Sequence, residues 1–274
     1  MSRRLANNVA LGLLWAAAIS TVIILFSIIA YVFVNGIKSL SLAFIFTWPR
    51  GINYEGGIWP TITNTLYVTA LAMIIATPIA VLAAVYLAEY AKQGKTVDTI
   101  RFAADSLASV PSIVLGLFGF ALFVEAMGFG FSMLSAALAL SFLMLPIIMR
   151  TTEESIRAVP RYIRWGSYGM GATKWQTVSR AVLPAAAPRI ITGIILATGR
   201  AVGETAVVIY TMGDSINQAK SPLDGGVGMT VHLYRLAMEG INLPAAYGTA
   251  LVLMILILAF NLTARWVLKR YRKV

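Results

Sequence analysis

The sequence predicts an all-α integral membrane protein with six transmembrane helices. Its 274 residues are 59% hydrophobic and 12% charged, with a mean hydropathy of +0.80, whereas about a quarter of the residues in a soluble domain are charged. Runs long enough to cross about 30 Å of hydrocarbon recur along the chain. The five uncharged runs are residues 5–37, 56–88, 106–124, 126–149 and 240–264. A sixth run, residues 190–213, contains Arg200 and Glu204.

The Lys and Arg residues predict the orientation, because cytoplasmic loops carry an excess of positive charge. With the N-terminus inside, 17 of the 22 Lys and Arg residues face the cytoplasm. They are Arg3, Arg4, Lys92, Lys95, Arg101, Arg150, Arg157, Arg161, Arg164, Lys174, Arg180, Arg189, Arg265, Lys269, Arg270, Arg272 and Lys273. We therefore expect a multi-pass protein of the cell membrane with both termini cytoplasmic. The net charge of +11 follows this topology and does not indicate nucleic-acid binding.

Composition also limits the chemistry. The chain has no cysteine and a single histidine, His232, which excludes disulfides, Cys-ligated zinc and iron–sulfur clusters. A His-rich metal site or a Ser-His-Asp triad is disfavoured for the same reason. The sequence also lacks the GxxxxGK(S/T) phosphate loop of nucleotide-hydrolysing proteins. We therefore expect no catalytic residues and no metal site in this chain.

The first half of the chain predicts four spans. After a cytoplasmic segment, residues 1–10, the first transmembrane helix covers residues 11–34 and is too long for the core of a signal peptide. An outer loop rich in Trp, Tyr, Gly and Pro follows, which suits the membrane interface. The next three helices contain Pro78, Pro111 and Pro146, each interpreted as a kink that neighbouring helices accommodate.

Two further features are predicted in this half of the chain, a hairpin and a set of ion pairs. Gly128 and Gly130 predict a tight outer hairpin between the third and fourth helices. Near the inner helix ends, we expect Glu89 and Asp105 to pair with a basic residue, Lys92 or Arg101.

The long inner loop, residues 150–189, is basic and amphipathic. Two capping-box patterns predict helix starts within it. These are Thr151 with Glu154, and Thr173 with Gln176. We expect a short helix over residues 161–170 after Pro160, a left-handed turn at Gly171, and a second helix over 174–182 that stops at Leu183–Pro184. Such a pair of helices can rest on anionic lipid or form a docking platform.

The platform interpretation is favoured by a family resemblance. RWGSYGMGATKWQTVSRAVLP, residues 164–184, resembles the cytoplasmic motif of ATP-binding-cassette (ABC) importer permeases, in which Glu-Ala-Ala precedes a Gly and a Leu-Pro pair. Gly171 and Leu183–Pro184 match, whereas Trp165, Gly166 and Ser167 replace Glu-Ala-Ala. Four further segments resemble the PstA-type membrane subunit of phosphate importers. They are YLAEYA (86–91), SVPSIVLGLFGFAL (109–122), LMLPIIMRTTEES (143–155) and TGIILATGRAVGETA (192–206).

The resemblance implies a type I ABC importer permease fold over residues 60–274. It also implies membrane lipid and four protein partners. These are a second, PstC-type permease in the membrane, two copies of a cytoplasmic PstB-type ATPase, and an external PstS-type phosphate-binding protein. ATP and Mg would be bound by the ATPase. A coupling helix in the inner loop would seat on that ATPase. Its residues would be Trp165, Gly171, Ala172, Thr173, Lys174, Leu183 and Pro184.

The charges of the sixth run allow two interpretations. A charged side chain at the centre of a span costs roughly 2.5–3.5 kcal/mol on an insertion scale, and Glu204, four residues after Arg200, would share its helix face. The pair is then a neutralised ion pair that only packs the helix into the bundle. Alternatively, Arg200 faces a water-filled path and offers its planar fork to phosphate. It would then pair at rest with Glu204, or with an acid of the second permease, and exchange that partner for the anion.

Other functions remain open on the sequence. A sister permease for sulfate, molybdate or phosphonate would share the inner-loop motif. An ATP-independent channel is less favoured, because a voltage sensor needs several arginines at three-residue spacing and this run has one. The segment GRAVGETA is the feature that we associate with phosphate.

Overall fold

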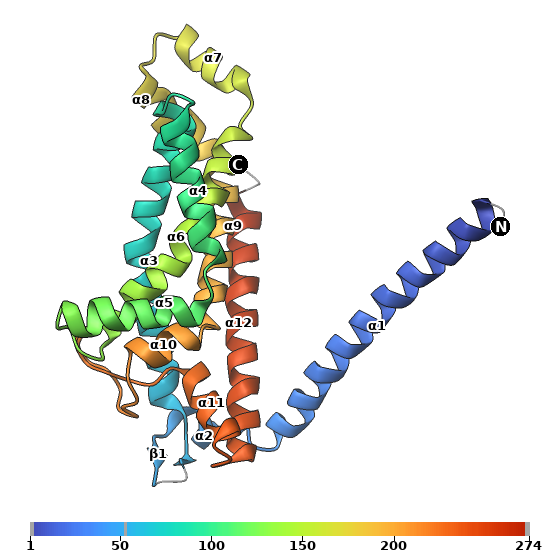
Figure 1. Cartoon of the computed structure of the whole chain (residues 1–274), viewed down its shortest axis with the longest axis vertical. Helices are drawn as coiled ribbons and strands as arrows, with labels where there is room; N and C mark the ends of the chain where they lie inside the picture. Colours follow the sequence, from blue (N-terminus) through green and yellow to red (C-terminus); the bar gives the residue numbers. More distant parts are fainter. Residues whose placement is uncertain (1–2, 52–53, 272–274) are drawn as a thin grey trace.

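The computed structural model describes residues 3–51 and 54–271, and the described chain is mainly helical (Figure 1). Besides the long helices of the bundle, it contains α1 (Arg3–Ile37), α2 (Leu42–Phe46), the antiparallel pair β1 (Pro49–Arg50) and β2 (Glu55–Gly56), α10 (Ala206–Thr211) and α11 (Met229–Met238). The bundle contains α3 (Trp59–Val85), α4 (Lys95–Ser109), α5 (Ser112–Gly119), α6 (Met133–Arg157), α9 (Leu183–Val202) and α12 (Leu243–Tyr271). The inner loop contains α7 (Arg161–Gly169) and α8 (Lys174–Thr177). Three π-helical segments extend these helices: η1 (Tyr86–Tyr90), η2 (Phe120–Ala126) and η3 (Val178–Val182).

The core of the bundle is the contact between α3 and α6. Along α3, Ala72, Ala76, Ala80 and Ala84 recur every four residues and are fully buried. Small residues at this spacing let two helix backbones approach closely, which is the main source of helix association in lipid. In Figure 1, α3, α6, α9 and α12 run side by side along the long axis of the molecule.

Helix α1 leaves the bundle at one end and diverges from it (Figure 1). None of its most apolar window is buried. Near its C-terminal end it meets α12, where the Tyr31 and Tyr247 rings pack edge to face with centroids 5.7 Å apart. At Gly36 an added Cβ would lie 2.6 Å from the Tyr247 carbonyl oxygen, so only glycine permits this approach.

Four predicted spans are confirmed as single helices long and apolar enough to cross a membrane. They are Asn7–Ile37, Trp59–Tyr90, Met133–Arg157 and Leu243–Thr263. A fifth such helix covers Lys174–Val202, and a bent pair, Lys95–Ser109 and Ser112–Ala126, makes a sixth if counted as one span. The predicted inner residues Arg272 and Lys273 lie outside the described residues.

The third span is not the kinked helix that the sequence predicts. Helix α4 ends at Ser109, and the chain turns by 100° before it continues as α5 and η2. Val110 and Pro111 are both extended, with ψ of 130° and 136°. A proline disfavours helical geometry in the preceding residue, so the break falls at this pair. The Gly128 and Gly130 hairpin that follows is confirmed, with positive φ at both glycines.

The inner loop begins later than predicted. Helix α6 continues to Arg157, so Thr151 does not start a helix; its hydroxyl donates to the Ile147 carbonyl, 2.8 Å away within the same helix. Pro160 precedes α7 as predicted. Gly171 has φ of 81° and turns the chain as predicted. The capping box of Thr173 and Gln176 is also confirmed.

The sequence predicted that the second inner helix would stop at Leu183–Pro184, but the helix continues past this pair. Helix α8 passes through η3 directly into α9, giving one continuous span. A proline inside a helix clashes with the carbonyl four residues earlier. Here that carbonyl belongs to Arg180, inside the widened π-helical turn of η3. Such turns are inserted into α-helices at functional sites, and this one lets the chain carry Pro184 without ending.

Candidate functional site

Arg200 lies near the end of α9, where two broken spans meet. Its side chain is exposed and borders a small hollow lined by Val110 at the α4–α5 break, by Leu115 of α5 and by Leu143 of α6. Within residues 3–51 and 54–271, no group forms a hydrogen bond or ion pair with it. No described residue therefore uses the guanidinium donors of Arg200.

Glu204 does not share a helix with Arg200. Helix α9 ends at Val202, and Glu204 stands in the break before α10. Its carboxylate accepts from the backbone N–H groups of Ala206 and Val207, at 3.1 and 3.5 Å. A carboxylate here satisfies free N–H groups at a helix start and suits the positive end of its dipole. The predicted ion pair, which required a continuous helix, is thus wrong for the described structure.

The two half-helices α5 and α10 pack directly on each other. A Cβ added at Gly116 of α5 would lie 2.7 Å from the Ala206 carbonyl oxygen. One added at Gly119 would lie 3.0 Å from the Thr211 Cγ2 and 2.7 Å from the Ala139 Cβ. Close packing of α5 on α10 therefore depends on the two glycines, and it holds both breaks beside Arg200.

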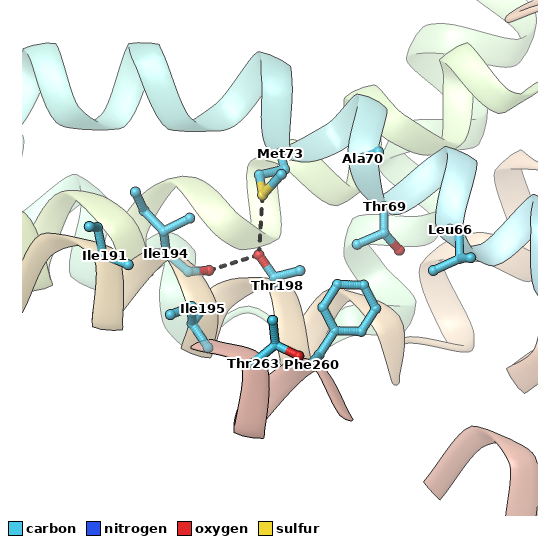
Figure 2. Close-up of a pocket in the computed structure, with 10 residues that line it drawn as sticks. All are labelled: Leu66, Thr69, Ala70, Met73, Ile191, Ile194, Ile195, Thr198, Phe260 and Thr263. Atoms are coloured by element: carbon cyan, nitrogen blue, oxygen red, sulfur yellow. Dashed lines mark hydrogen bonds between the residues drawn. The ribbon is translucent and has the colours of Figure 1, made fainter. Parts of the chain in front are cut away.

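Helix α9 has two contrasting faces. Arg189, Thr192, Leu196 and Arg200 are exposed and recur every three or four residues, so they form one stripe. On the opposite face, Ile191, Ile194 and Thr198 line an apolar groove between α3, α9 and α12 (Figure 2). No charged residue lines that groove. The cationic stripe, and not the larger groove, therefore suits an anion.

The inner loop forms a hairpin of two helices at one end of the bundle (Figure 1). We call α7, the Gly171 turn and α8 the coupling hairpin. The Ala172 N–H donates to the Ser167 carbonyl, and the Ser167 and Thr177 hydroxyls lie 2.9 Å apart. At the base of the hairpin, the buried side chains of Val178 and Val182 pack against the ends of α3 and α6. The hairpin is thus a preformed unit.

Large side chains project from the coupling hairpin. Trp165 and Trp175 are 66% and 64% exposed, and Met170 is 85% exposed. Of the predicted coupling residues, Gly171, Thr173 and Lys174 are also exposed, whereas Ala172 is half-buried. Leu183 and Pro184 lie beyond the hairpin in α9. Exposed aromatic groups on a rigid support are typical of an interface.

Buried ion pairs hold the inner end of the bundle, and the sequence predicted their partners incorrectly. Glu89 of η1 pairs with Arg164 of α7, not with Lys92 or Arg101. Arg101 instead pairs with Glu153 of α6 at 2.8 Å, and Arg157 reaches the same carboxylate at 2.7 Å. The first pair joins residues 75 positions apart, which no local pattern could have revealed.

Comparison with known proteins places this geometry in a family. Residues 76–273 match the model of the "Binding-protein-dependent transport system inner membrane component" family. The chain belongs to this permease family. A probable ABC transporter permease protein, YqgI of Bacillus subtilis strain 168, is 36% identical over 97% of this chain and 96% of its own. Phosphate transport system permease protein PstA 1 of Mycobacterium tuberculosis H37Rv is 34% identical over 100% of this chain and 92% of its own.

Solved structures agree with the permease fold. A chain of a bacterial alginate ABC transporter, crystallised with an alginate-bound periplasmic protein, has a TM-score of 0.71 at 15% identity, covering 94% of both chains. A chain of the methionine ABC transporter MetNI, in an inward-facing conformation, has a TM-score of 0.63 at 21% identity, covering 78% of this chain and 94% of that one. These likenesses support the shared fold.

We call residues 213–240 the outer segment, and hydrogen bonds tie it to the start of α3. The Asn64 amide donates to the Asn217 and Val227 carbonyls, at 3.0 and 3.3 Å, and its oxygen accepts from the Ala219 N–H at 3.0 Å. His232 of α11 is buried with its ring edge-to-face on Tyr54. Burial, and next the charge of Arg235, lower the pKa of His232 to about 4. His232 is therefore neutral at physiological pH.

Proposed function

We propose that this permease is the PstA-type membrane subunit of an ATP-driven importer of inorganic phosphate, and that Arg200 contacts the anion in transit. The observation that carries the proposal is the exposed guanidinium of Arg200 beside two helix breaks, without a partner among the described residues. Charged residues inside a membrane are rare and mark substrate paths unless they are paired. The planar fork of arginine matches phosphate oxygens in both geometry and charge.

The stripe on α9 gives this contact a direction. Arg189 lies three turns from Arg200, about 16 Å along the helix axis at 1.5 Å per residue, and is also exposed. Within the described part of the chain no group pairs with Arg189. These two cations lie on one face and would attract an anion toward the coupling hairpin. The Glu154 carboxylate lines the same hollow as Arg189 and would weaken the attraction there.

The choice of phosphate is supported by relatives. Besides the mycobacterial protein, a Yersinia pestis protein named phosphate transport system permease protein PstA is 33% identical over 96% of this chain. Sulfate, molybdate or phosphonate would also be attracted by a positive path, so selectivity has to be measured. An ATP-independent channel is disfavoured by the preformed coupling hairpin, which a channel would not need.

The proposed partners follow from the surfaces. The exposed aromatic groups of the coupling hairpin would seat on a PstB-type ATPase, which binds the ATP and Mg. The open face of α9 would be completed by a PstC-type permease. A PstS-type binding protein would dock at the opposite end, near α11. The coupling hairpin then lies in the cytoplasm, and both termini with it.

Selectivity is tested with the complete complex in lipid vesicles, prepared with its co-expressed partners and a binding protein. We expect ATP-dependent uptake of radiolabelled phosphate that excess sulfate and molybdate do not reduce. Uptake of sulfate in preference to phosphate would contradict the proposal, as would phosphate uptake that proceeds without ATP.

The role of Arg200 is tested by Arg200→Gln. Removing a charge-assisted contact to a desolvated anion costs about 2–5 kcal/mol, so we expect uptake to fall by about 30-fold or more while the complex still assembles. Arg200→Lys keeps the charge without the fork and should retain part of the uptake. Arg3→Gln, an exposed arginine at the start of α1 and away from the bundle (Figure 1), is the matched control and should behave as wild type. Normal uptake by Arg200→Gln would refute the contact.

A further inference from the structure

The π-helical segment η1 is the place where both helices of the coupling hairpin touch the end of α3. From α7, the Arg164 Nε donates to a Glu89 carboxylate oxygen at 3.0 Å, and the Nη2 donates to the same oxygen. From α8, the Lys174 ammonium lies 4.9 Å from the centroid of the Tyr90 ring. Two cations from two helices thus contact adjacent residues of one turn.

Arg164 also holds the end of α6. Its Nη1 donates to the Val159 carbonyl at 2.8 Å, and its Nη2 donates to the Ile156 carbonyl at 2.9 Å. The last carbonyls of a helix have no partner within the helix and form the negative end of its dipole. One guanidinium therefore joins α7, the end of α3 and the end of α6.

These contacts are shielded from water. The Glu89 side chain is 8% exposed and the Arg164 side chain 18%. Around them α7 meets the bundle through apolar groups such as Ile163 and Val159, which can slide over one another. Two charge-assisted hydrogen bonds from one guanidinium to one carboxylate oxygen restrain both distance and angle. They transmit a displacement that apolar contacts alone would absorb.

We propose that Arg164 is the positioning residue that carries movement of the coupling hairpin to α3 and α6, with Glu89 as its receiver. The inference rests on one part of the proposed function, namely that an ATPase moves the hairpin. In this arrangement, closure of the ATPase shifts α7, and Arg164 moves η1 and the C-terminal end of α6 with it. Without Arg164 the ATPase still docks and turns over, but the spans no longer follow.

The first test measures phosphate uptake and ATP hydrolysis by the reconstituted complex for Arg164→Gln, Glu89→Gln and the double variant. A coupling free energy of 1–3 kcal/mol is typical, so we expect uptake per ATP to fall about tenfold in each single variant. Because the two residues act through one contact, the double variant should lose no more than either single one. Arg3→Gln, an exposed arginine at the start of α1, is the control and keeps wild-type coupling.

Two outcomes would overturn the inference. One is an unchanged ratio of uptake to hydrolysis in Arg164→Gln. The other is a parallel fall of uptake, hydrolysis and the amount of assembled complex, which would reduce the ion pair to a purely structural role. Arg164→Lys adds a check, because it keeps the charge but loses the fork, and should retain an intermediate ratio.

A second readout does not depend on phosphate. The chain has no cysteine, so Leu196→Cys places one thiol on the exposed stripe of α9, where Leu196 is 57% exposed. We expect ATP to change the labelling rate of this thiol severalfold when Arg164 is present, and to leave it unchanged in Arg164→Gln. An ATP-dependent change that persists in Arg164→Gln would overturn the inference. If the complex does not carry phosphate but labelling still depends on ATP and Arg164, the proposed substrate fails and this inference stands.

Discussion

The inner end and the middle of the bundle hold their charges in opposite ways. At the inner end, the carboxylates of Glu89 and Glu153 are buried and each is met by arginine from another helix. In the middle, Arg200 is exposed without a partner among the described residues, and Glu204 holds the start of α10 instead. The inner end is therefore cross-linked, whereas the middle keeps one cation available.

The difference indicates which part of the permease moves as a unit and which changes shape. Ion pairs with fixed geometry join α3, α4, α6 and α7 into one block. Near Arg200, both α4–α5 and α9–α10 are broken, and α5 packs on α10 through glycine. Packing between short half-helices can change without unfolding a span. We therefore expect the inner block to drive and the middle to respond.

The largest effect on stability is expected from Glu153→Ala. This change removes the buried partner of Arg101 and Arg157 and leaves Arg101, among the described residues, with only the exposed Asp98 as an ionic partner, 3.6 Å away. Breaking one side of a buried ion pair costs about 3–5 kcal/mol. Thermal unfolding of the detergent-solubilised complex measures the loss. The neighbouring Glu154 pairs with Arg150, but the two side chains are 63% and 50% exposed. Glu154→Ala should cost less than about 1 kcal/mol; equal losses would contradict a cross-linked inner end.

Gly116→Ala tests the packing in the middle. The added Cβ would lie 2.7 Å from the Ala206 carbonyl oxygen, and backbone cannot move aside as a side chain can. Overpacking of this kind costs about 1–3 kcal/mol and should slow phosphate uptake. Gly12→Ala in α1, where no atom lies within 4 Å, is the control and should be neutral. Unimpaired uptake by Gly116→Ala would show that α5 and α10 need no close contact.

Acid should weaken the outer segment through His232. Because its pKa is lowered to about 4 from about 6.5 in an unfolded chain, the unfolded state binds more protons below pH 6.5. Stability should therefore be complete above pH 6.5 and fall as the pH drops toward 4, by about 2 kcal/mol at pH 5. His232 is the only histidine, so His232→Phe should remove most of this slope. An equal pH dependence in the variant would contradict the assignment.

The smallest effect is expected at Glu204, where two variants distinguish a helix cap from a partner of Arg200 in anion exchange. If its carboxylate only caps α10, Glu204→Gln keeps an acceptor oxygen and should transport nearly normally. Glu204→Ala should lose about 1 kcal/mol of stability, as for other helix caps. Uptake assays and melting curves of the two variants distinguish these cases. A strong uptake defect in Glu204→Gln would instead restore an exchange of Arg200 between Glu204 and the anion.

Much of the fold could be predicted from the sequence, because hydrophobic length and loop charge follow directly from the bilayer. The errors share one cause. A residue pattern reports helix propensity, but tertiary contacts decide whether a helix continues. Pro111 broke its span, whereas Pro184 did not. The Glu204 pairing failed because an i, i+4 relation holds only within an unbroken helix.

The parts of the candidate site that depend on local sequence features could also be predicted. Arg200 stood out because one charge in an apolar run is a local anomaly. The turn at Gly171 and the cap at Thr173 are local features too, and both were confirmed. Arg164 and Glu89 could not be matched, because an inner-loop arginine has many equivalent partners until the folded chain brings one of them close.

The separation of α1 from the bundle has a consequence for biogenesis. During synthesis α1 leaves the ribosome before the other helices of this chain, yet almost all of its length faces away from the finished core. The other helices can thus acquire their native packing without waiting for it. Substitutions along most of α1 should consequently leave the melting temperature of the helical core nearly unchanged.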